Sequence, residues 1–143
     1  MDLLKQISIE TACARLVSQY CFAIDGGDSE QWIALFTPDC KWVRQGQPAV
    51  LGHEGLKAFL ASRSKTAATR HVSTNVLVDV IDDSHATGRS YTLLYAATAT
   101  SAPNVPVLRP PQRLIECRDE YCLFDGAWRI AVRTNRPCMV AAG

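Results

Sequence analysis

Residues 70–82 read RHVSTNVLVDVID, and this stretch marks the point where the chain changes from helical to strand periodicity. Its side chains alternate with a period of two, which is typical of a β-strand with two different faces. One predicted face carries Val72, Thr74, Val76, Val78 and Val80, and the other carries His71, Ser73, Asn75, Leu77 and Asp79. We expect the polar face to line a wet cavity while the valine face packs elsewhere.

Before this strand, apolar residues recur at helical spacing. From Ile9 to Ile24 they follow the i, i+3, i+4, i+7 pattern of an amphipathic helix, with Ser8 as the predicted N-cap and Gly26-Gly27 as its end. A short second helix is predicted to open at Asp28 and to end before Pro38. A strand over 40–45 and a third helix over about 53–62 follow.

After this strand, a turn at 82–84 leads into a long predicted strand over about 85–98. Residues 101–111 hold four of the seven prolines and predict a loop. Two further strands are predicted over 112–124 and 127–134, joined by the hairpin turn Asp125-Gly126. Helices followed by a meander of long strands indicate an α+β fold, and 143 residues predict a single domain over 1–143.

Composition excludes several classes of function. Fifteen basic residues against fourteen acidic ones give no field suited to a nucleic acid. The apolar runs are too short to cross a membrane, and no export signal is present, so we expect a cytoplasmic protein. The six cysteines lack a Cys-x-x-Cys pair and the three histidines are scattered, so we expect free thiols, no metal and no cofactor.

Asp25 is the most informative candidate for chemistry. It continues the line of Val17 and Cys21 at spacings of four, so its carboxylate is predicted to point inward. It also lies in the last helical turn, where the helix dipole disfavours an anion. Both effects predict that Asp25→Asn keeps or raises stability. The alternative is that Asp25 begins the Asp-Gly-Gly turn and faces water.

His71 is the predicted partner of Asp25, because an imidazole held by a carboxylate is a base near neutral pH. Tyr20, on the same helical stripe, is predicted to offer its phenol to a substrate oxygen. The alternatives are a structural histidine and a core tyrosine. Trp42, Tyr91 and Tyr95 are candidate aromatic walls or core residues. Arg129 and Arg133 share one face of the last strand and line a pocket or face solvent.

Several segments together resemble the SnoaL-like branch of the nuclear-transport-factor-2-like (cystatin-like α+β barrel) superfamily. They are Tyr20-Cys-Phe-Ala-Ile-Asp25, Trp32 to Asp39, Gly52, Arg70-His71 with Asn75, and Asp125 to Ile130. The resemblance runs from about residue 7 to residue 133. It implies a cone in which a strongly curved, mixed but mainly antiparallel sheet wraps around three N-terminal helices, with a pocket between them and frequent dimerisation through the sheet.

Similar members include scytalone dehydratase, bile-acid 7α-dehydratase and hexachlorocyclohexane dehydrochlorinase, which need no cofactor and use a His-Asp dyad. The resemblance implies that Asp25 and His71 form this dyad and that Tyr20 assists it. It also implies pocket roles for Trp42 and Arg133. Ile24 departs from scytalone dehydratase, which has a tyrosine there.

The function expected from these residues is a lyase or isomerase of the dehydratase type, acting on a small apolar cyclic or aromatic substrate. Asp25, His71 and Tyr20 are its candidate catalytic residues. Its candidate substrate-binding residues are Trp42, Asn75, Tyr91, Tyr95 and Arg133. The alternatives are a ligand-binding or assembly subunit, as in dioxygenase β-subunits, and a polyketide-cyclase-like enzyme. We expect a small-molecule substrate and a homodimer or higher homo-oligomer, with neither nucleic acid nor membrane as partner.

Overall fold

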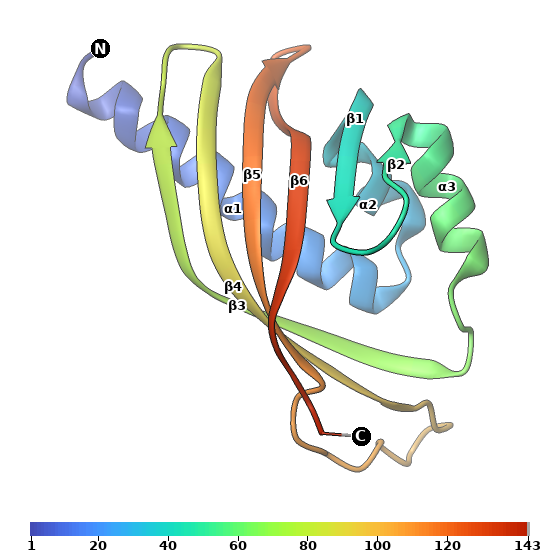
Figure 1. Cartoon of the computed structure of the whole chain (residues 1–143). Helices are drawn as coiled ribbons and strands as arrows, with labels where there is room; N and C mark the ends of the chain where they lie inside the picture. The colour runs from blue at the N-terminus through green and yellow to red at the C-terminus, as the bar shows by residue number, and fades with distance from the viewer. Residues whose placement is uncertain (143) are drawn as a thin grey trace.

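A curved six-stranded sheet and three helices make up the structure, a computed structural model that describes residues 1–142 (Figure 1). The elements are α1 Leu3–Gly26, α2 Ser29–Ala34, β1 Phe36–Arg44, β2 Val50–Leu51, α3 Gly52–Ser62, β3 Ala67–Val80, β4 His85–Thr98, β5 Arg113–Phe124 and β6 Ala127–Val140. The strand order is β2-β1-β6-β5-β4-β3, and only the β1–β6 pair is parallel. The predicted α+β fold with a mixed, mainly antiparallel sheet is confirmed.

Helix α1 crosses one face of the sheet and packs chiefly against β3, while α3 packs against β1 and β2 (Figure 1). Helix α1 begins at Leu3 rather than at the predicted Ile9, because Asp2 caps it by accepting a hydrogen bond from the Lys5 N–H at 2.9 Å. It ends as predicted, since Gly27 takes the left-handed conformation with φ 73°.

The segment after α1 leaves the helical conformation earlier than predicted. Asp28 caps α2 by accepting from the Gln31 N–H at 3.1 Å, as the sequence indicates. However, β1 already starts at Phe36, because the Phe36 side chain is fully buried and the Ile130 N–H donates to the Leu35 carbonyl at 2.8 Å. Pro38 lies where the β1–β6 register shifts, so its missing N–H breaks no regular ladder.

A β-bulge divides β3 and changes which side chains face the helices. The register moves from Thr74↔Tyr91 to Leu77↔Arg89, which leaves one extra residue in β3, and Asn75 has φ 55°. Beyond it, Val78 and Val80 pack against the core whereas Leu77 is 46% exposed. The predicted assignment of one valine face and one polar face is therefore wrong after Thr74, because simple alternation does not survive an inserted residue.

A second bulge in β6 separates the two arginines that were predicted to share a face. Tyr121 pairs with Ile130 and Glu120 with Val132, so Ala131 is the extra residue. Arg133 consequently turns inward and is 2% exposed, while the side chain of Arg129 reaches the Ala34 carbonyl. Strand β6 also runs to Val140, past the predicted end at residue 134, because it pairs with β5 along that whole length.

Two further features concern residues 1–142, the state of the cysteines and the character of the helices. All six cysteines are free thiols, four of them buried. Within this part of the chain, no helix is both long and apolar enough to cross a membrane.

Candidate active site

Asp25 and His71 are in direct contact where α1 ends against β3. The His71 Nδ1 atom lies 2.6 Å from Asp25 Oδ1, and the His71 backbone N–H donates to Asp25 Oδ2 at 2.7 Å. Both side chains are largely buried, with 9% of the Asp25 side chain and 15% of the His71 side chain exposed. The carboxylate thus points inward, as its helical spacing predicts, and does not face water.

Two further residues fix the carboxylate. The Thr69 hydroxyl donates to Asp25 Oδ1 at 3.0 Å, and Arg63 donates to Thr69 Oγ1 at 3.3 Å. Arg63 also donates to the Ile24 carbonyl at 3.2 Å, near the end of α1 where helical carbonyls lack partners. Sequence reasoning missed Thr69 and Arg63, because neither belongs to a recognisable motif. The signal available for Thr69 was its position two residues before His71 on the same strand face.

Charge and hydrogen bonding determine the protonation of this pair. Burial acts to raise the pKa of Asp25. The hydrogen bonds from His71, the charge of His71 and the hydrogen bond from Thr69 outweigh this effect and hold the pKa below its ordinary value. An ionised carboxylate only accepts hydrogen bonds, so the proton of the neutral imidazole lies on Nδ1. His71 Nε2, which has no hydrogen-bond partner within residues 1–142, therefore keeps its lone pair.

His71 lines a cavity of about 210 Å³ between the helices and the sheet, together with Tyr20, Trp42 and Arg133. The ring of Tyr20 meets that of His71 edge to face at 6.4 Å. Burial raises the pKa of Tyr20 to about 12, so its phenol is a hydrogen-bond donor at neutral pH. The dyad also borders a hollow of about 640 Å³ between α1 and β3.

Arg133 lies inside the cone, but its charge is already matched. It forms a two-point ion pair with Asp119, with both N–O distances at 2.8 Å, and Tyr121 donates to the same carboxylate at 2.9 Å. The guanidinium also lies over the ring of Tyr20 at 4.1 Å. Sequence reasoning missed Asp119; the signal was its place between Cys117 and Tyr121 on one strand face.

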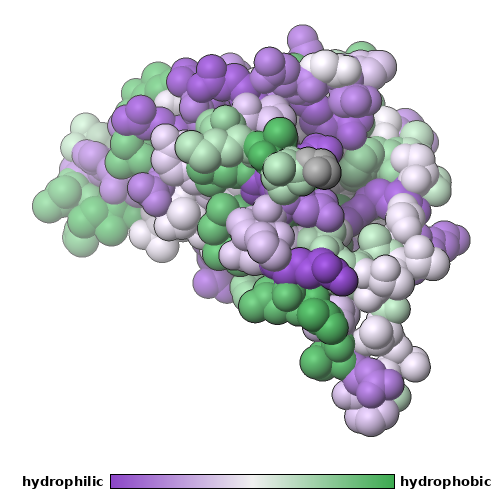
Figure 2. Space-filling model, turned by 60° about the horizontal axis from the view of Figure 1, so that its bottom comes forward, coloured by the Kyte–Doolittle hydropathy of each residue, from purple (hydrophilic) through white to green (hydrophobic). Residues whose placement is uncertain are grey.

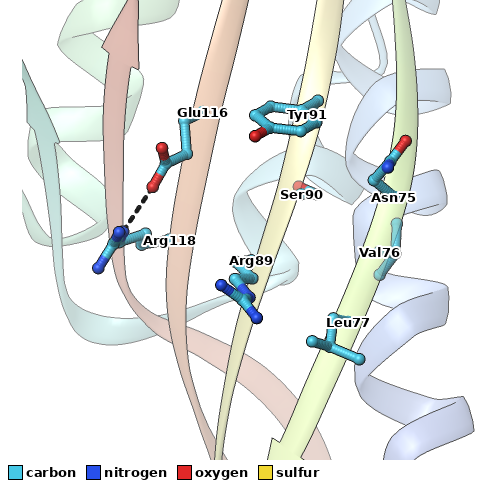
Figure 3. Close-up of a pocket in the computed structure, with 8 residues that line it drawn as sticks. All are labelled: Asn75, Val76, Leu77, Arg89, Ser90, Tyr91, Glu116 and Arg118. Atoms are coloured by element: carbon cyan, nitrogen blue, oxygen red, sulfur yellow. Dashed lines mark hydrogen bonds and ion pairs between the residues drawn. The ribbon is translucent and has the colours of Figure 1, made fainter. Parts of the chain in front are cut away.

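The structure places three predicted substrate-binding residues elsewhere. Asn75 and Tyr91 lie on the outer face of the sheet, where they line a shallow hollow with Arg89, Glu116 and Arg118 (Figure 3). Tyr91 points outward because its neighbours Ser90 and Thr92 are buried inward, and Asn75 does so because of the bulge. Tyr95 has the same outward parity and lines a hollow beneath the proline-rich loop. These three side chains do not border the cavity of His71.

The described part of the chain also lacks a cluster of side chains that could bind a metal ion. Within residues 1–142, no three His, Cys, Asp or Glu side chains gather as a metal site would require.

Comparison with known proteins finds a family and solved structures that this chain resembles. The family model of the SnoaL-like domain matches residues 5–134. A variant of a protein of unknown function from Mycobacterium tuberculosis superposes with a TM-score of 0.80 and 28% identity, covering 99% of this chain and 79% of that one.

Two further structures are more distant in sequence. A putative scytalone dehydratase from Novosphingobium aromaticivorans has a TM-score of 0.80 and 21% identity, with 96% and 89% of the two chains covered. A hexachlorocyclohexane dehydrochlorinase from Novosphingobium barchaimii has a TM-score of 0.80 and 17% identity, with 98% and 93% covered. Identities this low show a shared fold. A search of curated proteins finds no match by sequence.

Proposed function

Because the chain belongs to the SnoaL-like domain family, which its residues 5–134 match, we propose that it is a lyase or isomerase of the dehydratase type. His71 Nε2 takes a proton from a carbon next to an activating group. Asp25 holds the ring in the required tautomer and stabilises the imidazolium that forms. The observation that carries the proposal is the 2.6 Å contact between His71 Nδ1 and Asp25 Oδ1 at the edge of a cavity.

Tyr20 and Trp42 have supporting roles in this proposal. The Tyr20 phenol, which burial keeps protonated, donates to the oxygen that develops or departs as the C–H bond breaks. Trp42 contributes an aromatic wall to the cavity. The substrate is a small cyclic or aromatic molecule, and no cofactor takes part in the proposed step. We propose further that the protein acts in the cytoplasm.

The experiment that tests this function follows proton abstraction alone, so the complete substrate is not needed. A panel of cyclic ketones and cyclic β-hydroxy ketones is incubated with the protein in D₂O, and exchange at the α-carbon is followed by NMR. We expect at least one member to exchange faster than in buffer. His71→Gln and Asp25→Asn should each slow this exchange by ~10²–10⁴.

The double variant separates a dyad from two independent residues. Since the two side chains act as one unit, the variant with both changes should be hardly slower than either single variant. A contrary outcome is that panel members bind but exchange at the same rate with the native protein and with His71→Gln. It would contradict the enzymatic function and favour a ligand-binding subunit.

A further inference from the structure

The cavity beside His71 carries positive charge that the proposed proton transfer does not use. Four arginines line it, namely Arg44, Arg63, Arg113 and Arg133, and no Asp or Glu does. Asp119, which does not itself line the cavity, forms an ion pair with Arg133 and neutralises its charge. The other three arginines form no ion pair with any carboxylate in residues 1–142. A partly enclosed site with unmatched cations favours an anionic ligand.

Arg44 is the best positioned of these cations. Its guanidinium lies 4.9 Å from the ring centres of both Trp42 and Phe59, so two aromatic faces hold it in place. The side chain is half-buried, and its Nε atom is buried without an acceptor. Loss of solvation without a compensating partner is costly, and an anion in the cavity would offset this cost.

The neighbouring polar groups point to the same kind of ligand. Trp42 is only 4% exposed, lines the cavity, and its indole Nε1–H has no acceptor. Arg63 donates only to neutral oxygens, and Arg113 is an exposed residue on the cavity wall. Among the buried cavity groups without a partner, Arg44 Nε and Trp42 Nε1 are donors and Asn135 Oδ1 is an acceptor. Together with the unpaired arginines, the two donors favour a ligand with negative charge.

We propose that the cavity binds an organic carboxylate, with Arg44 as its principal receptor. A guanidinium offers two parallel N–H groups that match the two oxygens of a carboxylate. Ile24, Leu94 and Ile115 make part of the remaining wall apolar, and the volume of about 210 Å³ admits only a small molecule. This inference rests on the proposed function and names its substrate class: an apolar body that carries a carboxylate, which Arg44 anchors while His71 acts on a neighbouring carbon.

The test compares two probes of the same shape and different charge. Binding of trans-cinnamate and of its neutral amide is measured by calorimetry for the native protein. We expect the carboxylate to bind about tenfold to a hundredfold more tightly. Arg44→Gln should lower the ratio of the two affinities to about fivefold or less, the part that Arg113 supplies, while it changes amide binding little. Arg15→Gln, an exposed position on α1 outside the cavity, removes the same charge and should leave the ratio unchanged.

A second variant covers the case in which Arg44→Gln does not fold. Arg113 is exposed, so Arg113→Gln should fold and should lower the ratio by a smaller factor, about twofold to fivefold. Equal binding of the two probes to the native protein would overturn the proposal, as would a ratio that persists in Arg44→Gln. His71→Gln should keep the carboxylate preference while it slows exchange by ~10²–10⁴. Failure of the anion site and failure of the enzymatic function can therefore be told apart.

Discussion

Asp25 occupies the last turn of α1, where the helix dipole and burial both disfavour a negative charge. From these effects alone, replacement by Asn is expected to keep or raise stability. The structure leads us to the opposite prediction, because the carboxylate accepts hydrogen bonds from the His71 N–H, the His71 ring and Thr69. An Asn side chain accepts through only one atom, and its NH₂ group would meet a donor.

We therefore predict that Asp25→Asn destabilises the protein by ~1–3 kcal/mol at pH 7. Because the folded state holds the pKa of Asp25 below 3.8, the carboxylate's contribution is fully present above that value. It is lost as the pH falls through the lower pKa of the folded state. Urea unfolding at pH values from 3 to 7 should show the native protein losing its advantage over the variant on the acid side. An advantage independent of pH would contradict the assignment.

The buried pair of Arg133 and Asp119 leads to a second prediction. Asp119→Asn leaves the Arg133 guanidinium buried without a counter-charge and should cost ~3–5 kcal/mol of unfolding free energy. Tyr121→Phe, which removes only a hydroxyl that donates to the same carboxylate, is the matched control and should cost ~1 kcal/mol. Chemical denaturation measures both. Similar losses for the two variants would show that the ion pair does not hold this part of the core.

At this scale the sequence allowed part of the site to be predicted. Asp25 and His71 could be found because a helical stripe and a strand face each aim one side chain inward. Asp119 and Arg133 could not be paired in advance, because the extra residue at Ala131 shifts the register of the predicted hairpin and brings Arg133 opposite Asp119. Asn75 was misplaced for the same kind of reason.

The strands show why alternation alone misplaces side chains. In β3 the bulge at Asn75 reverses which residues face the helices, so that Val78 and Val80, predicted on the face away from the cavity, pack against the core. Asn is tolerated there because its short polar side chain accepts a positive φ more readily than most residues. A pattern of polar and apolar letters does not reveal such an insertion, since the period of two resumes on the other face.

We predict that Asn75→Val destabilises the fold by ~1–2 kcal/mol, because a β-branched residue is strained at φ 55°. Asn75→Gly is the control, since glycine adopts positive φ without strain. Its unfolding free energy should stay within ~0.5 kcal/mol of the native value. Thermal or urea unfolding checks both variants. If Val is tolerated as well as Gly, the left-handed conformation at this position is not needed.

For the molecule as a whole, the order and type of most elements followed from the sequence. Strand β4 has the predicted bounds, and the hairpin at Asp125-Gly126 has positive φ at both residues, as its turn requires. The pairing of β1 with β6 could not be worked out from local patterns, because it joins segments more than ninety residues apart in the chain, about 36–44 and 130–135. The two-residue strand β2 carries too little pattern to be predicted.

The surface of the molecule bears on its association. Apolar residues are exposed on the outer sheet face, with Val72 at 48% and Leu77 at 46%, and on the proline-rich loop, with Val107 at 73%. Figure 2 shows hydrophobic patches separated by hydrophilic surface, one of them on the lower part of the molecule. We predict that light scattering finds a dimer or higher oligomer at micromolar concentration.

If the subunits associate through the outer face of the sheet, Leu77→Lys should weaken the association. Leu108→Lys on the loop, at a residue that is 83% exposed, is the matched comparison. A monomer at every concentration would contradict the prediction.

In the proposed function, Asp25 holds the His71 ring with its proton on Nδ1 and leaves Nε2 free as the base. Long-range proton–nitrogen NMR of the ¹⁵N-labelled histidines, recorded where the ring is neutral, measures the tautomer directly, and His71→Gln assigns the signal. We predict a protonated Nδ1 and an unprotonated Nε2 in the native protein, and a mixture of tautomers in Asp25→Asn. A proton on Nε2 in the native protein, or a tautomer unchanged by Asp25→Asn, would contradict this role of Asp25.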